Sequence, residues 1–331
     1  MMTLLNRPQH TISYLSRPAL CGPLRAAKPV FLKEIADRCG LTSQVRARNP
    51  GPMTSSLSDR VAHLTSLCAS LRADILTMIA KAGSGHPGGS LSAVDAIATL
   101  YAYVLRHSPK NPHWPDRDRF ILSKGHGVPA LYAVLAHFGY FEKSELSSLR
   151  TLGSRLQGHP VVGTVPGIEA CTGSLGQGLS VAQGMALGGI LDQKSFNVYC
   201  MLGDGEIQEG QIWEAAMSAA KYKSENLIAI LDRNRGQIDG FTKDVMPLEP
   251  LVDKWTAFGW QVKSVDGHDY AQLLDSFAWA QQRAGSPKLI VANTVKGKGV
   301  SFMENDMDWH GAAPNKEQLA KALIELGARP E

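Results

Sequence analysis

Two polar side chains follow two apolar runs, each of which predicts a buried strand. Gly203-Asp204-Gly205 follows the run at residues 198–202, and Asn234 follows the run at residues 227–231. Parallel strands joined by a helix end side by side, so Asp204 and Asn234 should approach each other. A carboxylate, an amide oxygen and a backbone carbonyl form a half shell that suits Mg²⁺ or Ca²⁺ completed by phosphate oxygens. Gly-Asp-Gly alone also fits an ordinary turn, and it is the asparagine after the next strand that favours a cation site.

A second glycine cluster, Thr172-Gly173-Ser174-Leu175-Gly176-Gln177-Gly178, opens a small-residue helix that ends near Gly189. Free backbone amides at a glycine-rich helix start bind anions, and a diphosphate would suit them. The spacing matches neither a P-loop nor the dinucleotide-binding fingerprint. Close helix packing through small residues is the alternative interpretation.

Four histidines lie in loops rich in glycine or proline, namely His86, His126, His159 and His310. A single loop histidine is most often a surface residue. Four that converge on one pocket would serve proton transfer and hydrogen bonding to a polyhydroxylated substrate. None has the spacing of a zinc ligand.

The elements that must position these residues alternate between strand and helix patterns. Helical patterns span residues 54–82, 91–105, 209–222 and 270–283, and apolar strand patterns span residues 198–202, 227–231 and 289–295. This alternation predicts an α/β fold with a doubly wound, mostly parallel sheet and helices on both faces. Ligands in such sheets bind at the carboxyl ends of the strands.

Composition narrows the possible partners. Of 331 residues, 44% are hydrophobic and 19% are charged, which excludes wholesale disorder. No apolar run approaches the roughly 18 residues of a spanning helix, so no membrane association is expected. Residues 1–52 hold eight basic residues against Glu34 and Asp37, and this excess is larger than the whole-chain net charge of +4. The remainder is therefore slightly acidic, and nucleic acid is not an expected partner.

Residues 1–52 show no sustained periodicity and are interrupted by prolines. We interpret them as a disordered extension produced by an upstream translation start, with Met53 beginning the protein proper; a transit-like segment is the alternative. Residues 53–331 then form one large domain. Five widely spaced cysteines favour a reduced, cytoplasmic setting without disulfides.

Several motifs together resemble one family. Gly203-Asp204-Gly205 with Asn234 resembles the thiamine diphosphate fingerprint. The glycine clusters at 84–88 and 172–178, with Gln208-Glu209-Gly210 and Ile238-Asp239-Gly240, resemble transketolase in order and spacing over residues 57–316. The resemblance implies the thiamine diphosphate-binding fold of the amino-terminal transketolase domain. The chain length resembles the split bacterial form, in which two genes encode the two halves.

The resemblance also implies roles for individual residues. Asp204 and Asn234 would bind Mg²⁺, or Ca²⁺ or Mn²⁺, through their side chains, and Gly236 through its carbonyl. Residues implied to contact the cofactor are His126, Gly173, Leu175, Gly203, Asp204, Gly205 and Asn234. His86, His159 and His310 would line the substrate channel. Glu209 and Glu214 would lie near the glutamate that activates the cofactor, at the subunit contact. Gly236 departs from the apolar residue common at its position, so a more mobile loop is expected.

The activity that the resemblance implies is transfer of a two-carbon glycolaldehyde unit from a ketose phosphate to an aldose phosphate. It further implies self-association and a partner, the carboxy-terminal transketolase subunit with the pyrimidine-binding domain. Two alternatives remain open. One is a subunit of another thiamine diphosphate enzyme, such as a 2-oxo-acid dehydrogenase alpha chain or a relative of deoxyxylulose-phosphate synthase. The other is a catalytically silent scaffold subunit.

Overall fold

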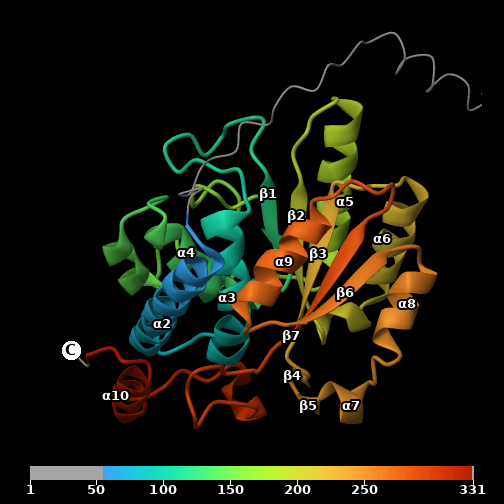
Figure 1. Cartoon of the computed structure of the whole chain (residues 1–331). Helices are drawn as coiled ribbons and strands as arrows, with labels where there is room; N and C mark the ends of the chain where they lie inside the picture. The colour runs from blue at the N-terminus through green and yellow to red at the C-terminus, as the bar shows by residue number, and fades with distance from the viewer. Residues whose placement is uncertain (1–54, 330–331) are drawn as a thin grey trace, which may run out of the picture. The chain divides into compact units, whose positions relative to one another are not determined.

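A five-stranded parallel sheet forms the centre of the domain (Figure 1). The structure is a computed structural model that describes residues 55–329, so the predictions for residues 1–52 lie outside the described residues. The strand order is β1-β2-β3-β7-β6. The strands are β1 (Arg119–Leu122), β2 (Val198–Gly203), β3 (Leu227–Arg233), β7 (Lys288–Asn293) and β6 (Gln261–Asp266). A small antiparallel pair, β4 (Gly236–Gln237) and β5 (Gly240–Phe241), follows β3.

The sheet divides the hydrophobic core into two clusters because successive side chains of each strand point to opposite faces. In β2, Tyr199 and Met201 belong to one cluster, while Cys200 and Leu202 belong to the other. The same alternation holds in β3 and β7. Both faces of the sheet are therefore buried, which confirms the predicted doubly wound fold.

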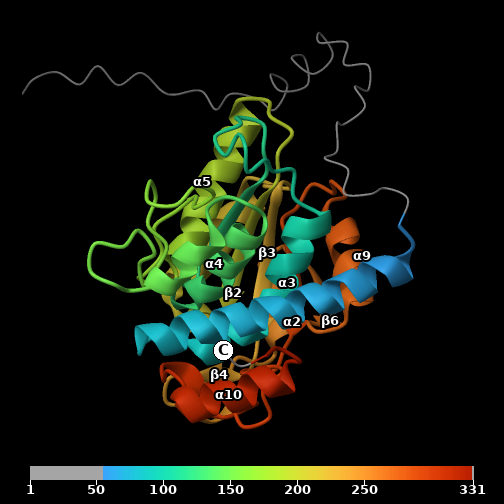
Figure 2. The same ribbon diagram turned by 90° about the vertical axis from the view of Figure 1, so that its left-hand side faces the viewer.

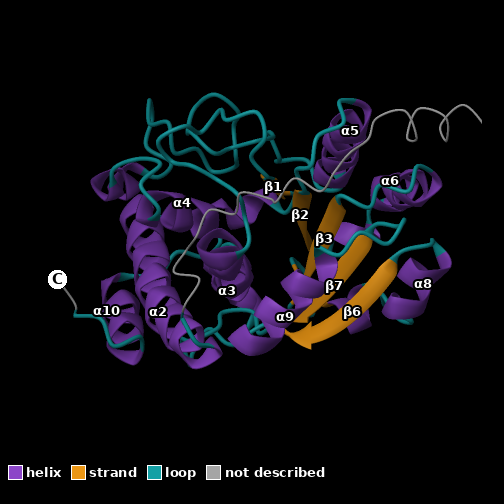
Figure 3. Ribbon diagram, turned by 45° about the horizontal axis from the view of Figure 1, so that its top comes forward, coloured by secondary structure: helices purple, strands orange, loops and turns teal. Residues whose placement is uncertain are grey.

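Helices cover both faces (Figures 2 and 3). On one side of the sheet lie α3 (Pro87–Tyr103), α4 (Val128–His137) and α9 (Tyr270–Ala280). Outside these helices pack α2 (Leu57–Ala82) and α10 (Lys316–Glu325) (Figure 3). On the other side lie α5 (Gln177–Leu191), α6 (Gly210–Lys221) and α8 (Leu251–Ala257). Short helices complete the domain: η1 (Gly125–Gly127), η2 (Lys143–Ser148), η3 (Glu206–Gln208), α7 (Thr242–Val245) and η4 (Met307–His310).

Local signals set the helix ends. The predicted helix at 54–82 is α2, which begins at Leu57 because Ser56 and Asp59 form a capping box. It ends at Gly83, whose φ of 63° is left-handed. The helix predicted at 91–105 is α3, which begins earlier, at Pro87, because a proline at the first helical position needs no hydrogen-bond partner.

Two strands of the five-stranded sheet escaped sequence-based prediction. β1 has only four residues, and β6 is an edge strand in which Val265 is the one buried side chain. Neither gives a long apolar run. No described helix is long and apolar enough to cross a membrane.

Candidate active site

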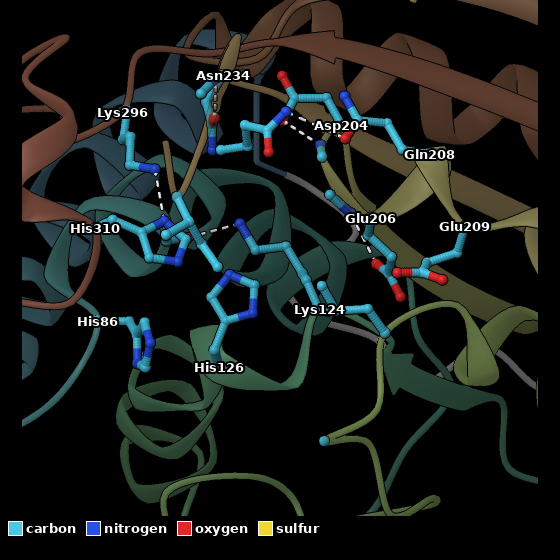
Figure 4. Close-up of a pocket in the computed structure, with 18 residues that line it drawn as sticks. His86, Lys124, His126, Asp204, Glu206, Gln208, Glu209, Asn234, Lys296 and His310 are labelled. Carbon is cyan, nitrogen blue, oxygen red and sulfur yellow. Dashed lines mark hydrogen bonds between the residues drawn. The ribbon is translucent and has the colours of Figure 1, made fainter. Parts of the chain in front are cut away.

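A cavity of about 440 Å³ opens at the carboxyl ends of β1, β2 and β3 (Figure 4). The residues predicted at this cavity that line it are His86, His126, Gly173, Leu175, Gly203, Asp204, Gly205, Glu209, Asn234, Gly236 and His310. Those not predicted are Gly89, Lys124, Glu206, Gln208, Gln237, Ile238 and Lys296. The position agrees with the rule that parallel sheets bind ligands at their strand ends.

Asp204 is a buried carboxylate, only 1% exposed, in the turn after β2. It accepts backbone N–H hydrogen bonds from Gly205 at 3.0 Å and from Arg235 at 2.5 Å. No ion pair to it occurs within residues 55–329. Burial, followed by the charge of Asp232, raises the pKa of Asp204 to about 7. The site thus offers a carboxylate that lacks a charged partner.

Asn234 lies beside this carboxylate with its amide orientation fixed by hydrogen bonds. Its Nδ2 donates to Ser92 Oγ and to Asp232 Oδ2, both at 3.2 Å. Its Oδ1 accepts the N–H of Gly236 at 3.0 Å. The amide oxygen, with its second lone pair, is therefore the Asn234 atom suited to a cation.

Lys124 forms a buried ion pair behind the predicted metal ligands. Its Nζ lies 2.5 Å from Asp232 Oδ2 and also donates to the carbonyl of Gly89 at 2.9 Å. Burial alone would raise the pKa of Asp232, but Lys124 and the hydroxyl of Thr294 hold it below its ordinary value. Asp232 is thus neutralised by protein groups, whereas Asp204 is not.

Glu206 joins three of the segments that form the cavity. Its carboxylate accepts hydrogen bonds from the Ser123 hydroxyl, from the Gly176 N–H at 3.0 Å and from the Gly203 N–H at 2.9 Å. Ser123 follows β1, Gly203 ends β2, and Gly176 precedes α5. Burial raises the pKa of Glu206. This residue orders the glycine-rich loop at the predicted diphosphate position.

That loop leaves the start of α5 open to the cavity. Gly176 caps the helix in the left-handed conformation, with φ of 84°, and no side chain caps it. Gly173 and Leu175 line the cavity just before it. Uncapped backbone amides at a helix start favour an anion, as the sequence predicted.

Three of the four predicted histidines meet in the cavity. The ring centroids of His86, His126 and His310 lie 5.2–5.3 Å from one another. Burial, then nearby positive charge, lowers the pKa of His86 to about 4 and that of His310 to about 3. The pKa of His126 falls well below its ordinary value for the same reasons. All three imidazoles are therefore neutral near pH 7.

Lys296 adds a second buried cation that sequence patterns did not reveal. Its Nζ lies 2.8 Å from Nδ1 of His310 (Figure 4). Burial, then the charge of Lys124, lowers the pKa of Lys296 to about 8. The cavity wall therefore holds two lysines, which suits an anionic ligand.

His159 and Glu214 do not line the cavity. His159 lies behind Gly173, where an added Cβ would stand 3.6 Å from the imidazole. Glu214 is exposed on α6, and Glu209, which caps that helix, is exposed at the cavity edge. Their predicted roles therefore depend on a ligand or partner that approaches from outside.

Gly236 has a specific reason to be glycine. A Cβ at this position would stand 2.5 Å from Sδ of Met307, so the Met307 side chain occupies the space that a larger residue would fill. Met307 comes from η4, the short helix that ends at His310. The apolar surface expected at residue 236 is thus supplied by another segment.

No group of three or more His, Cys, Asp or Glu side chains in the described part of the chain is arranged to hold a metal alone. Asp204, Asn234 and the Gly236 carbonyl provide oxygen donors only, and phosphate oxygens would complete the shell of a hard cation. The fold, the open helix start and these donors fit a cofactor that combines a diphosphate with a divalent cation. They define the diphosphate-binding domain of a thiamine diphosphate-dependent enzyme.

Comparison with known proteins narrows this class to one family. Residues 64–331 match the family model for the transketolase thiamine diphosphate-binding domain, and the chain belongs to this family. It is 47% identical over 251 residues to the 6-deoxy-6-sulfo-D-fructose transketolase subunit of Clostridium sp. (strain MSTE9), covering 76% of this chain and 91% of that protein. It is 43% identical over 260 residues to the apulose-4-phosphate transketolase subunit of Phocaeicola vulgatus, covering 78% of this chain and 92% of that protein.

The transketolase structure from Campylobacter jejuni superposes with a TM-score of 0.78 at 35% identity. The match covers 82% of this chain but only 44% of that one. The chain therefore corresponds to the amino-terminal subunit of a split transketolase, which agrees with its near-complete coverage of the two bacterial subunits.

Proposed function

We propose that this chain binds thiamine diphosphate and Mg²⁺ and, with a complementary subunit, transfers a glycolaldehyde unit from a ketose to an aldose. The observation that carries the proposal is the cavity that joins an unpaired carboxylate, Asp204, to three neutral imidazoles. The carboxylate suits a metal ion bound to a diphosphate, and the imidazoles suit the hydroxyls of a sugar. The silent-scaffold alternative has no use for this combination.

The residues present fit the cofactor. Asp204 Oδ, Asn234 Oδ1 and the Gly236 carbonyl would hold Mg²⁺, and Ca²⁺ or Mn²⁺ would satisfy the same oxygen donors. The open start of α5 and the nearby lysines would receive the diphosphate. When bound, thiamine diphosphate supplies the nucleophile and the electron sink for cleavage of a carbon–carbon bond beside a carbonyl.

The imidazoles would bind the sugar. A neutral histidine carries one N–H donor and one acceptor nitrogen, and it exchanges protons near neutral pH. His86 and His310 lie in the cavity, where they can hold donor hydroxyls and move their protons. His159 would join them if the substrate extends past Gly173.

A complementary subunit would cover the exposed side of the site. Ile238 lines the cavity although its side chain is 68% exposed. Val181 on α5 and Met217 on α6 are also exposed, and Gly184 and Gly188 leave open space along α5. We propose that this face contacts the subunit with the pyrimidine-binding domain. The assembly would contain two copies of each chain, with Glu209 and Glu214 near the contact.

The natural donor is proposed to be a ketose with an anionic group at its far end. The two bacterial relatives are named for a sulfonated ketose and a ketose phosphate. We propose that the chain acts in the pentose phosphate pathway, in the cytoplasm, where its donor would be a ketose phosphate. Because one relative, 47% identical, is named for a sulfonated ketose, such a ketose is the other candidate donor.

The test is co-expression of the full chain with a complementary polypeptide of the pyrimidine-binding type. The purified complex, with thiamine diphosphate and Mg²⁺, should convert a ketose phosphate and an aldose phosphate into the two exchanged sugars, detected by mass spectrometry. A parallel reaction with a sulfonated ketose assigns the donor class. A complex that binds the cofactor but decarboxylates 2-oxo acids and transfers no glycolaldehyde would refute the proposal.

A further inference from the structure

Arg150 connects two loops near the histidine cluster. Its Nη1 donates to the Ser84 hydroxyl at 3.0 Å, and its Nη2 lies 3.4 Å from Nδ1 of His86. Its own backbone is fixed by a left-handed φ of 58° and an N–H bond to the carbonyl of Leu156 at 2.9 Å. The guanidinium is therefore held against the loop that precedes α3.

The chain returns over this guanidinium at Gly158. A Cβ at this position would stand 2.9 Å from Cζ of Arg150, so a larger residue here would force the guanidinium to shift. The next residue is His159, whose pKa is lowered by burial and then by the charge of Arg150. Arg150 is thus packed between two of the histidines predicted to serve the substrate.

In the contact between Arg150 and His86, only the imidazole can accept a hydrogen bond. A guanidinium carries five N–H donors, has no acceptor and stays protonated. Nδ1 of His86 must therefore be the acceptor, which leaves the ring proton on Nε2. We propose that Arg150 is a positioning residue that fixes His86 as the neutral Nε2–H tautomer, so that His86 donates a hydrogen bond to a ligand oxygen in the cavity. The consequence for turnover rests on the proposed function, whereas the tautomer itself does not.

The surroundings of His86 support this assignment. Its backbone is restrained because Pro87 follows it, and its carbonyl accepts the Ser90 hydroxyl at 2.7 Å. The charged and titratable groups that face it are Arg150, His159, Lys296, Lys124, His126 and His310. None of these is acidic. Burial and this positive field lower the pKa of His86 to about 4, so the ring is neutral at physiological pH.

The tautomer is tested directly by ¹⁵N NMR of the ¹⁵N-histidine-labelled full chain. His86 is assigned by the signals lost in His86→Gln. At pH 7 we expect an unprotonated Nδ1 and a protonated Nε2. In Arg150→Met, which removes the donors but keeps much of the length of the side chain, both tautomers should appear. A protonated Nδ1 in the unaltered chain, or an unchanged spectrum in Arg150→Met, would overturn the proposal.

The functional consequence is tested in the complex with the complementary subunit. Arg150→Met should lower kcat/KM for the ketose donor by roughly 10- to 100-fold, in line with other residues that orient a functional imidazole. Thiamine diphosphate affinity should stay within about twofold, because Arg150 is not among the residues lining the cofactor cavity. Arg150→Lys should recover part of the loss.

The pH profile gives a readout that a structural role alone would not change. Burial is the largest cause of the low pKa of His86, and the charge of Arg150 is the next, so removing this cation should raise that pKa above about 4 while burial still holds it below its ordinary value of 6.5. His86 would then become protonated at a higher pH than in the unaltered chain, so the acidic limb of kcat/KM should move to higher pH. In a His86→Gln background, Arg150→Met should cause no further shift.

Two further variants keep the test valid if Arg150→Met folds poorly. Gly158→Ala places a methyl group against the guanidinium and should reproduce the mixed tautomer with Arg150 intact. Arg155→Met, which breaks the partly exposed pair with Glu145 in the same segment, should change neither the spectrum nor kcat/KM. If the NMR result holds while no ketose is turned over, the proposed function fails and the tautomer assignment stands.

Discussion

Among single residues, Asp204 differs from two neighbouring buried carboxylates, Asp232 and Glu206, because within residues 55–329 it has neither a paired cation nor three hydrogen-bond donors. Asp232 pairs with Lys124, and Glu206 is enclosed by three hydrogen-bond donors. We therefore expect Asp204→Asn to weaken Mg²⁺-dependent thiamine diphosphate binding by at least about 100-fold, beyond the loss typical of residues that only support a metal ligand. Isothermal titration of the complex with the complementary subunit, in Mg²⁺ and in EDTA, measures this.

Asp239→Asn is the matched control, because Asp239 is an exposed carboxylate in the loop that also contains Asn234. Its cofactor affinity should equal that of the unaltered chain. Equal binding by Asp204→Asn and Asp239→Asn would remove Asp204 from the metal site.

Glu206→Gln tests the residue that orders the glycine-rich loop. The amide cannot accept all three donors, so at least one buried donor, such as the N–H of Gly176, loses its partner. Such a loss costs about 1–3 kcal/mol of stability. Thermal unfolding should show a lower Tm, and cofactor affinity should fall. Glu209→Gln, an exposed change three positions away, should leave Tm unchanged, and a normal Tm for Glu206→Gln would contradict the assigned role.

Sequence patterns located Asp204 and Asn234 because a turn glycine and a strand end fix where each side chain lies. They did not locate Glu206 or Lys296. Lys296 is a cavity residue only because the segment after β7 is buried against η4, and no short-range pattern encodes that contact. Lys124 lies two residues before His126, but its pairing with Asp232 depends on the register of β1, β2 and β3.

Among the elements, α2, α3 and α9 are joined by one buried carboxylate. Asp95 on α3 lies 2.6 Å from Arg72 on α2 and 2.6 Å from His268, and it accepts the Tyr270 hydroxyl at 2.9 Å. Burial alone would raise the pKa of Asp95, but Arg72 and His268 hold it at about 2. Three helices thus share one electrostatic contact.

Asp95→Asn should lower the free energy of unfolding by about 3–5 kcal/mol, because it leaves the buried Arg72 without its counter-charge. Asp275→Asn, which removes the more exposed partner of Lys263, should cost about 1 kcal/mol or less. Urea unfolding at pH 7 compares the two. Similar midpoints for both variants would show that Asp95 contributes no more than a surface pair.

The same contact makes a pH prediction. The pKa of Asp95 is lower in the folded chain than its ordinary value of 3.8, so its stabilisation is complete above about pH 4 and is lost as the pH falls toward 2. A shift of this size corresponds to about 2 kcal/mol. This part of the acid destabilisation should be missing in Asp95→Asn when Tm is followed from about pH 5 to about pH 2.

The sequence patterns predicted those strands and helices that are long and well buried. β2, β3 and β7 are buried on both faces and gave apolar runs, and α2 gave a long helical period. β1 is too short for a pattern, and the edge strand β6 carries Lys263 and Ser264 among its apolar residues. The order β3-β7-β6 depends on which strands pair, which the sequence pattern alone does not specify.

For the whole molecule, we expect the chain alone to bind cofactor weakly and to transfer no glycolaldehyde. The exposed face of α5 and α6 would be covered only in the assembly. Size-exclusion chromatography with light scattering should show a complex with two copies of each chain after co-expression. Robust transfer by this polypeptide alone, with mass spectrometry showing no second chain, would contradict the split arrangement.

Gly188→Glu tests the contact face itself. A Cβ at Gly188 meets no atom within 4 Å, so the isolated chain should keep its Tm. The charged side chain should nevertheless block close helix packing and prevent assembly, which light scattering would detect. Lys316→Glu, a charge change at the exposed start of α10 and outside this face, serves as the surface control. Normal assembly of Gly188→Glu would exclude this face as the contact.

The division of the core by the sheet has a consequence for how this domain tolerates change. Cys68 and Leu100 belong to one cluster and Ala186 and Trp255 to the other, and the strands lie between them. Helix substitutions in different clusters are separated by the strands, so their effects on unfolding should add. Non-additive effects on stability should therefore occur only between substitutions in the same helical layer. Two sets of stabilising substitutions, each selected in one layer, should combine in one functional chain without further changes.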